Sequence, residues 1–153
     1  MEFIKKNGAK IVIAAIALTG LVLMLIYLFS INQLPEAFQP DFMGLTMVIG
    51  YAIFFAGVVA VCVCSILNVC KCIRGWILLV VGVLVTTFMS LALADTIQNW
   101  EHVYRPFGTP QHLPAEDTWA KFVIFPVVVQ LFVFGLFPLV KGAKKLLCSK
   151  KED

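Results

Sequence analysis

Charged residues are scarce in this chain of 153 residues: Asp, Glu, Lys and Arg together make up only 14%. A soluble domain has about 25% charged and about 45–50% apolar residues. Here the apolar fraction is 61% and the mean hydropathy is +0.95. This shortage of charge excludes a soluble globular domain, and the high apolar content excludes the fibrous and disordered classes. The composition therefore predicts a membrane protein, without indicating its activity.

Four stretches contain no charged residue at all, namely residues 11–31, 42–69, 75–94 and 122–140. The shortest has 19 residues and the longest 28, and a helix needs about 20 apolar residues to cross a bilayer. The segments between them fall below the roughly 40 residues that a folded soluble domain needs. We therefore predict an all-α membrane protein, with residues 1–153 forming a single antiparallel bundle of four transmembrane helices.

Lysine and arginine are nearly absent from one side of this predicted membrane topology. Four spans place the N-terminal piece, the turn at residues 70–74 and the C-terminal tail on the same side, which holds ten of the 12 basic residues. The positive-inside rule then predicts that both termini are cytoplasmic. The basic tail is expected to contact anionic membrane lipids, and no nucleic-acid partner is predicted.

The chain is therefore predicted to be a multi-pass protein of the cell membrane. Its last residues, Lys150-Lys151-Glu152-Asp153, resemble a dilysine retrieval signal, so the endoplasmic reticulum membrane is the alternative location.

The four apolar stretches contain no ionisable Asp, Glu, Lys, Arg or His residue, such as pumps and transporters place inside the bilayer. Most hydroxyl side chains there are expected to bond carbonyl groups of their own helix. Gln130 cannot be satisfied locally, so it is expected to hydrogen-bond another helix; a substrate or pore contact is the alternative. Pro126 and Pro138 in the same stretch predict a kink, either a static bend or a gating hinge.

Small residues recur at every fourth position in two neighbouring stretches. Because lipid provides no hydrophobic drive between helices, such residues allow the close approach that holds helices together. We expect the two rows to face each other, or one of them to face a partner. The predicted packing or partner-interface residues are Ala52, Ala56, Ala60, Gly82, Thr86, Ser90 and Gln130.

The outer loop at residues 95–121 lacks cysteine and any recognisable catalytic set. Its aromatic residues Trp100, Tyr104 and Trp119 are expected at the membrane surface, in a simple connector or a partner-docking element. His102 and His112 do not have the spacing of a metal-ligand motif, and no nucleophile lies beside them. No catalytic residue, metal site or cofactor is predicted.

All five cysteines fall in the predicted cytoplasmic segments or in the inner half of the second span. Reduced thiols are therefore expected rather than disulfides. In a eukaryote, Cys70, Cys72 and Cys148 would be candidates for palmitoylation.

By exclusion, the sequence predicts a non-catalytic accessory or scaffold subunit that binds other membrane proteins or further copies of itself. The alternative is a small transporter or channel whose pathway forms in an oligomer, near Gln130 and Pro126. A third hypothesis is a membrane enzyme that uses His102, His112 and the acidic residues near them.

Overall fold

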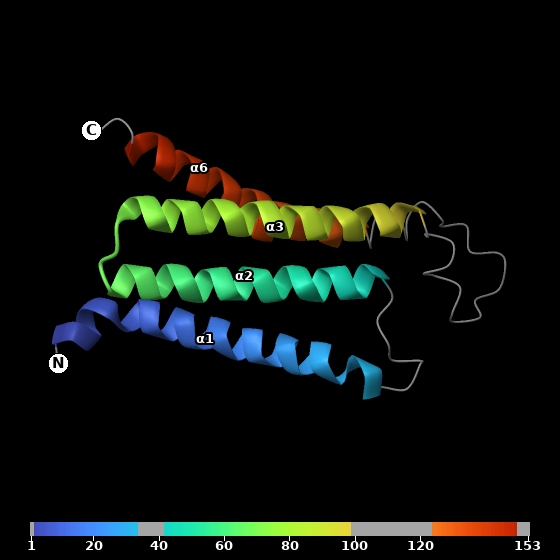
Figure 1. Ribbon diagram of the computed structural model, residues 1–153, viewed down its shortest axis with the longest axis horizontal. Helices are drawn as coiled ribbons and strands as arrows, with labels where there is room; N and C mark the ends of the chain where they lie inside the picture. Colours follow the sequence, from blue (N-terminus) through green and yellow to red (C-terminus); the bar gives the residue numbers. More distant parts are fainter. Residues whose placement is uncertain (1, 34–41, 99–123, 150–153) are drawn as a thin grey trace.

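The computed structural model describes residues 2–33, 42–98 and 124–149, and nearly all of these are helical (Figure 1). The elements are α1 (Glu2–Ser30), η1 (Ile31–Gln33), α2 (Phe42–Ile66), α3 (Lys71–Gln98), the π-helical segment η3 (Leu131–Leu136) and α6 (Phe137–Ser149). Residues 124–130, η3 and α6 form one continuous helix, which we call the fourth helix. Within the described residues, four helices are long and apolar enough to span a membrane, which confirms the predicted all-helical class.

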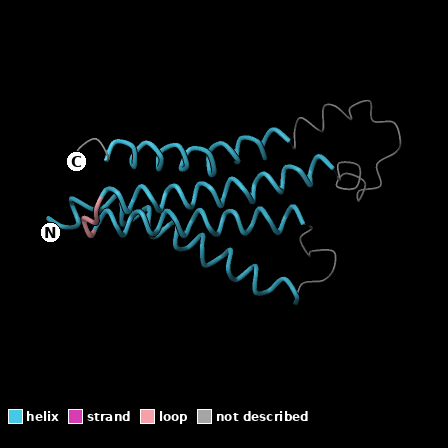
Figure 2. The backbone as a smooth tube through the Cα atoms, turned by 45° about the horizontal axis from the view of Figure 1, so that its top comes forward, coloured by secondary structure: helices cyan, strands magenta, loops and turns pink. Residues whose placement is uncertain are grey.

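Helices that follow one another in the sequence lie side by side and run in opposite directions. α1 packs on α2, α2 on α3, and α3 on the fourth helix, which crosses it obliquely (Figure 1). The start of α1, the turn between α2 and α3, and the end of α6 all lie at one end of the bundle (Figure 2). We call this the terminal end; its placement in the cytoplasm stays a prediction.

Three helices extend beyond the apolar stretches that predict them. α1 begins at Glu2 rather than residue 11, α3 covers Lys71–Gln98 rather than 75–94, and the fourth helix continues to Ser149 rather than 140. An apolar run measures only the part of a helix that crosses hydrocarbon. Lys, Glu and Gln are themselves good helix formers, so polar turns can continue the same helix on either side.

α2 instead ends three residues before its apolar stretch does, at Ile66. Asn68 has a φ angle of 53°, in the left-handed region that asparagine tolerates better than most residues. The Val69 N–H donates to the Cys64 carbonyl over 2.9 Å, which closes the last turn in the manner of a Schellman cap. This cap turns the chain sharply into α3.

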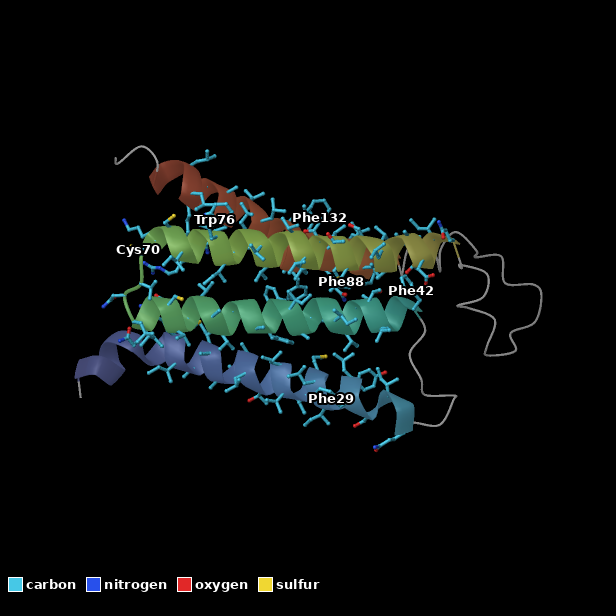
Figure 3. All side chains as sticks on the ribbon, in the orientation of Figure 1. Phe29, Phe42, Cys70, Trp76, Phe88 and Phe132 are labelled. Carbon is cyan, nitrogen blue, oxygen red and sulfur yellow. The ribbon has the colours of Figure 1, made fainter. Side chains whose placement is uncertain are left out.

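α3 is the most buried helix of the bundle. Its residues Val85, Met89 and Ala92 are fully buried, and the helix packs on both α2 and the fourth helix. α1, by contrast, buries only Asn7 and Ala17 among its described side chains, and Phe29 near its end is 82% exposed (Figure 3). Most of the α1 surface is therefore free to face lipid in a membrane.

Candidate functional site

Glycines mark the closest approach between α3 and the fourth helix. A Cβ atom added to Gly82 would lie 2.5 Å from the backbone nitrogen of Leu139, and one added to Gly142 would lie 2.6 Å from that of Leu79. Side-chain carbon atoms do not pack this closely. The two backbones touch here because neither glycine has a side chain, which is how helices associate without a hydrophobic drive.

α2 approaches α3 through glycines as well. A Cβ atom on Gly57 would lie 2.5 Å from Val81 Cγ2, and one on Gly50 would lie 3.2 Å from Met89 Cε. These two glycines are seven residues apart, about two helical turns, so both lie on one face of α2. The same spacing recurs in the other two packed helices, as Gly75 and Gly82 in α3 and Gly135 and Gly142 in the fourth helix.

The two predicted rows of small residues do not face each other. Gly82 and Thr86 of α3 contact the fourth helix at Leu139 and Gly135, whereas α2 meets α3 through its glycines. The first alternative therefore does not hold for Gly82 and Thr86, because spacing of every fourth residue identifies a face of a helix and not the neighbour that this face meets. The second alternative, that one row faces a partner, stays a prediction. The remaining members differ in exposure: Ala52 is buried, Ala60 is half-buried, and Ala56 and Ser90 are exposed.

Gln130 forms a polar link between the fourth helix and α2. Its Oε1 accepts a hydrogen bond from the Tyr51 hydroxyl. Phe134 packs edge-on against the Tyr51 ring, at 5.5 Å between centroids, and against Phe54 at 4.8 Å. Edge-to-face pairs add about 0.5–1.5 kcal/mol beyond area burial. An amide in hydrocarbon requires such a partner, and the aromatic rings keep this one in place.

The fourth helix changes to π-helical geometry directly after Gln130. The Phe137 N–H donates to the carbonyl of Phe132, five residues earlier, instead of the usual four. Pro138 follows at once, and its ring would clash with a carbonyl in a regular helical turn. The prolines predict a kink, and the structure shows wider π-helical turns immediately before the second of them.

A buried hydroxyl lies beside this segment. Thr86 Oγ1 is 2.7 Å from the Cβ position of Gly135 and has no hydrogen-bond partner among the described residues. Buried hydroxyl groups are normally bonded, and π-helical turns are frequent at functional sites. We call Tyr51, Thr86, Gln130 and η3 together the π-segment cluster; it is the candidate functional site in the described part of the chain.

Four threonine hydroxyl groups in the membrane-spanning helices are bonded within their own helices. Thr19, Thr46, Thr87 and Thr96 each donate to the carbonyl four residues earlier, over 2.7–3.0 Å. This confirms the expectation for Thr19, Thr46 and Thr87; Thr96 lies in the segment predicted as the outer loop, which α3 extends into. Their side chains are thereby occupied and stay on the surface of their helix.

Several predicted site residues lie outside the described residues. These are Trp100, Tyr104 and Trp119 of the outer loop, the histidines His102 and His112, and the tail from Lys150 to Asp153. Among the residues that are described, no three His, Cys, Asp or Glu side chains come together as metal ligands would. Cys62 and Cys64 are half-buried free thiols, and Cys70 and Cys72 are exposed free thiols.

Sequence reasoning missed two features that the fold creates. The sequence does not distinguish Tyr51 from the other polar residues of the spans, because its hydrogen-bond partner Gln130 is 79 positions away. The glycine contacts had a detectable signal, the seven-residue spacing, which a search at every fourth position passes over.

Comparisons of the chain with protein-family models, with curated proteins and with solved structures found no match. The geometry of the described residues therefore carries the functional proposal.

Proposed function

We propose that the protein is a non-catalytic membrane subunit that binds other membrane proteins through the outer surface of its helices. One observation carries this proposal: the glycines lie at contacts between helices inside the bundle, whereas other small residues lie on its outer surface. Ala56 of α2 and Ser90 of α3 are exposed. In hydrocarbon, a small exposed residue gives no advantage against lipid but lets a second helix approach closely.

The polar groups within the spans support a role that is structural rather than chemical. Gln130 and Tyr51 are bonded to each other, and four threonines are bonded to their own helices. Groups engaged in this way stabilise the helix arrangement and are not available to a substrate without breaking these bonds. These hydrogen bonds therefore support an accessory subunit rather than a protein that binds a substrate within its spans.

Crosslinking tests the proposed partner surface directly. A photoreactive phenylalanine analogue is placed at Ala56 in cells, and separately at Phe132, which is 58% exposed on the fourth helix and nearly isosteric with the analogue. We expect one discrete crosslinked protein from position 56, and none or a diffuse background from position 132. Equal diffuse crosslinking from both positions would mean that lipid covers Ala56. A product of twice the chain mass would mean that Ala56 contacts a second copy of this chain, which would contradict binding to a different membrane protein.

Transport through an oligomer is the second candidate, and the π-segment cluster favours it. A π-helical segment next to a polar pair and an unpartnered buried hydroxyl is a place where a membrane helix can change shape. Solute flux into proteoliposomes distinguishes this function from the first. A transporter predicts that Gln130→Leu alters flux while the assembly stays intact, whereas a subunit without a pathway predicts no flux in either protein.

A further inference from the structure

A group of basic side chains lies at the terminal end, between α3 and α6. Arg74 belongs to the first turn of α3, and Lys141 and Lys145 lie one turn apart on α6. The positive charges of Arg74 and Lys141 both act on Lys145. The helices are in direct contact here, because a Cβ atom on Gly75 would lie 3.4 Å from Lys145 Cβ. The cations are therefore held together by packed helices rather than spread along a tail.

No carboxylate balances this basic cluster of Arg74, Lys141 and Lys145 among the described side chains. The acidic side chain that the structure describes is Asp95, which belongs to the opposite end of α3. Arg74 Nη1 donates to Ser65 Oγ over 3.5 Å, which is long for a hydrogen bond, and Arg74 Nε is buried without a partner. A buried guanidinium N–H without an acceptor is destabilising. The cluster thus has donor capacity that the described part of the chain does not use.

The dipole of α3 adds to the demand for an anion. Lys71 and Arg74 are both in the first turn of α3, which contains no acidic residue. Positive charge is unfavourable at a helix N-terminus, where unpaired N–H groups favour anions. A phosphate group would reverse both effects, since arginine binds phosphate through two parallel hydrogen bonds and lysine adds a point charge.

We propose that the basic cluster binds the phosphate group of an anionic phospholipid. The surroundings favour a lipid over a free anion, because Trp76 is 55% exposed and Leu147 is 70% exposed on the same two helices. Figure 3 places Trp76 near Cys70, at the terminal end of the bundle. Tryptophan is typical of the bilayer interface, and basic pockets between membrane helices recognise anionic headgroups. This site is independent of the proposed partner surface.

The experiment uses the full chain purified in mild detergent. Thermal stability is measured after addition of phosphatidylglycerol, phosphatidylcholine or inorganic phosphate, and retained lipid is counted by native mass spectrometry. Four proteins are compared: the wild type, Arg74→Gln, Lys145→Gln and Lys10→Gln. The last removes one positive charge near the start of α1, outside the cluster.

We expect phosphatidylglycerol to raise the melting temperature of the wild type and of Lys10→Gln, with phosphatidylcholine and inorganic phosphate having little effect. Arg74→Gln should retain about tenfold less phosphatidylglycerol or still less, as expected for the loss of a charge-assisted hydrogen bond. If Arg74→Gln does not fold, Lys145→Gln carries the same test.

Three results would overturn the proposal. Equal stabilisation of all four proteins by phosphatidylglycerol would mean general charge attraction without a site. Stabilisation by inorganic phosphate alone would mean a site for a free anion. If phosphatidylglycerol had no effect on the wild type, the cluster would not bind lipid, and an acidic segment of a protein partner would be the alternative ligand.

Discussion

Replacing Gly82 by alanine adds a single methyl group where α3 touches the fourth helix. The new carbon would lie 2.5 Å from the nitrogen and 2.6 Å from the Cα of Leu139, whereas ordinary contacts begin at 3.4 Å. Since the obstacle is backbone, the two helices must separate by about 0.9 Å, and a gap of that size forfeits a quarter to a half of the dispersion energy nearby. Overpacking costs about 1–3 kcal/mol, and alanine regains about 1 kcal/mol through its helix propensity.

We therefore expect Gly82→Ala to lower the free energy of unfolding by up to about 2 kcal/mol, which corresponds to a fall in melting temperature of up to about 8 °C for a chain of this size. The assay is thermal unfolding in detergent, followed by circular dichroism. Gly8→Ala is the matched control, because a Cβ atom there meets nothing within 4 Å. Its stability should be unchanged or higher by up to about 1 kcal/mol. If Gly82→Ala were as stable as Gly8→Ala, the close packing of α3 on the fourth helix would be refuted.

Further predictions concern the polar link, the turn and the topology. Gln130→Leu and Tyr51→Phe should each cost about 0.6–2 kcal/mol, and the double variant no more than either one; additive losses would contradict the hydrogen bond. Asn68→Gly should fold normally, whereas Asn68→Val should cost about 1–2 kcal/mol in the same assay because of its positive φ angle; equal stability would be inconsistent with the cap. A membrane-impermeant thiol reagent should label Gln111→Cys in intact cells but not the wild type, and labelling of wild-type Cys148 would reverse the topology.

The four helices could be predicted from the sequence because crossing hydrocarbon demands about 20 apolar residues in any fold. Helix ends could not, since they depend on local events that hydropathy does not record. Asn68 ends α2 through a left-handed cap, and the C-terminal part of α6 continues because it packs on Gly75.

The candidate site was predictable only in part. An amide in the middle of a membrane span requires a hydrogen-bond partner on another helix, so Gln130 could be singled out from the sequence. Its partner Tyr51 could not, because that pairing depends on how α2 and the fourth helix are rotated about their axes. The basic cluster was hidden for a similar reason. Arg74 and Lys145 belong to different predicted segments, a short turn and a tail, and only the extension of both helices brings them together.

The composition of the native complex tests the proposed partner-binding function most directly. The protein is purified in mild detergent from its own host at its natural expression level, and the intact assembly is weighed by native mass spectrometry. A subunit that binds other membrane proteins predicts one complex of fixed stoichiometry containing at least one different membrane protein. A monomer, or an oligomer of this chain alone, would contradict that function, and an oligomer that also conducts a solute would favour transport instead.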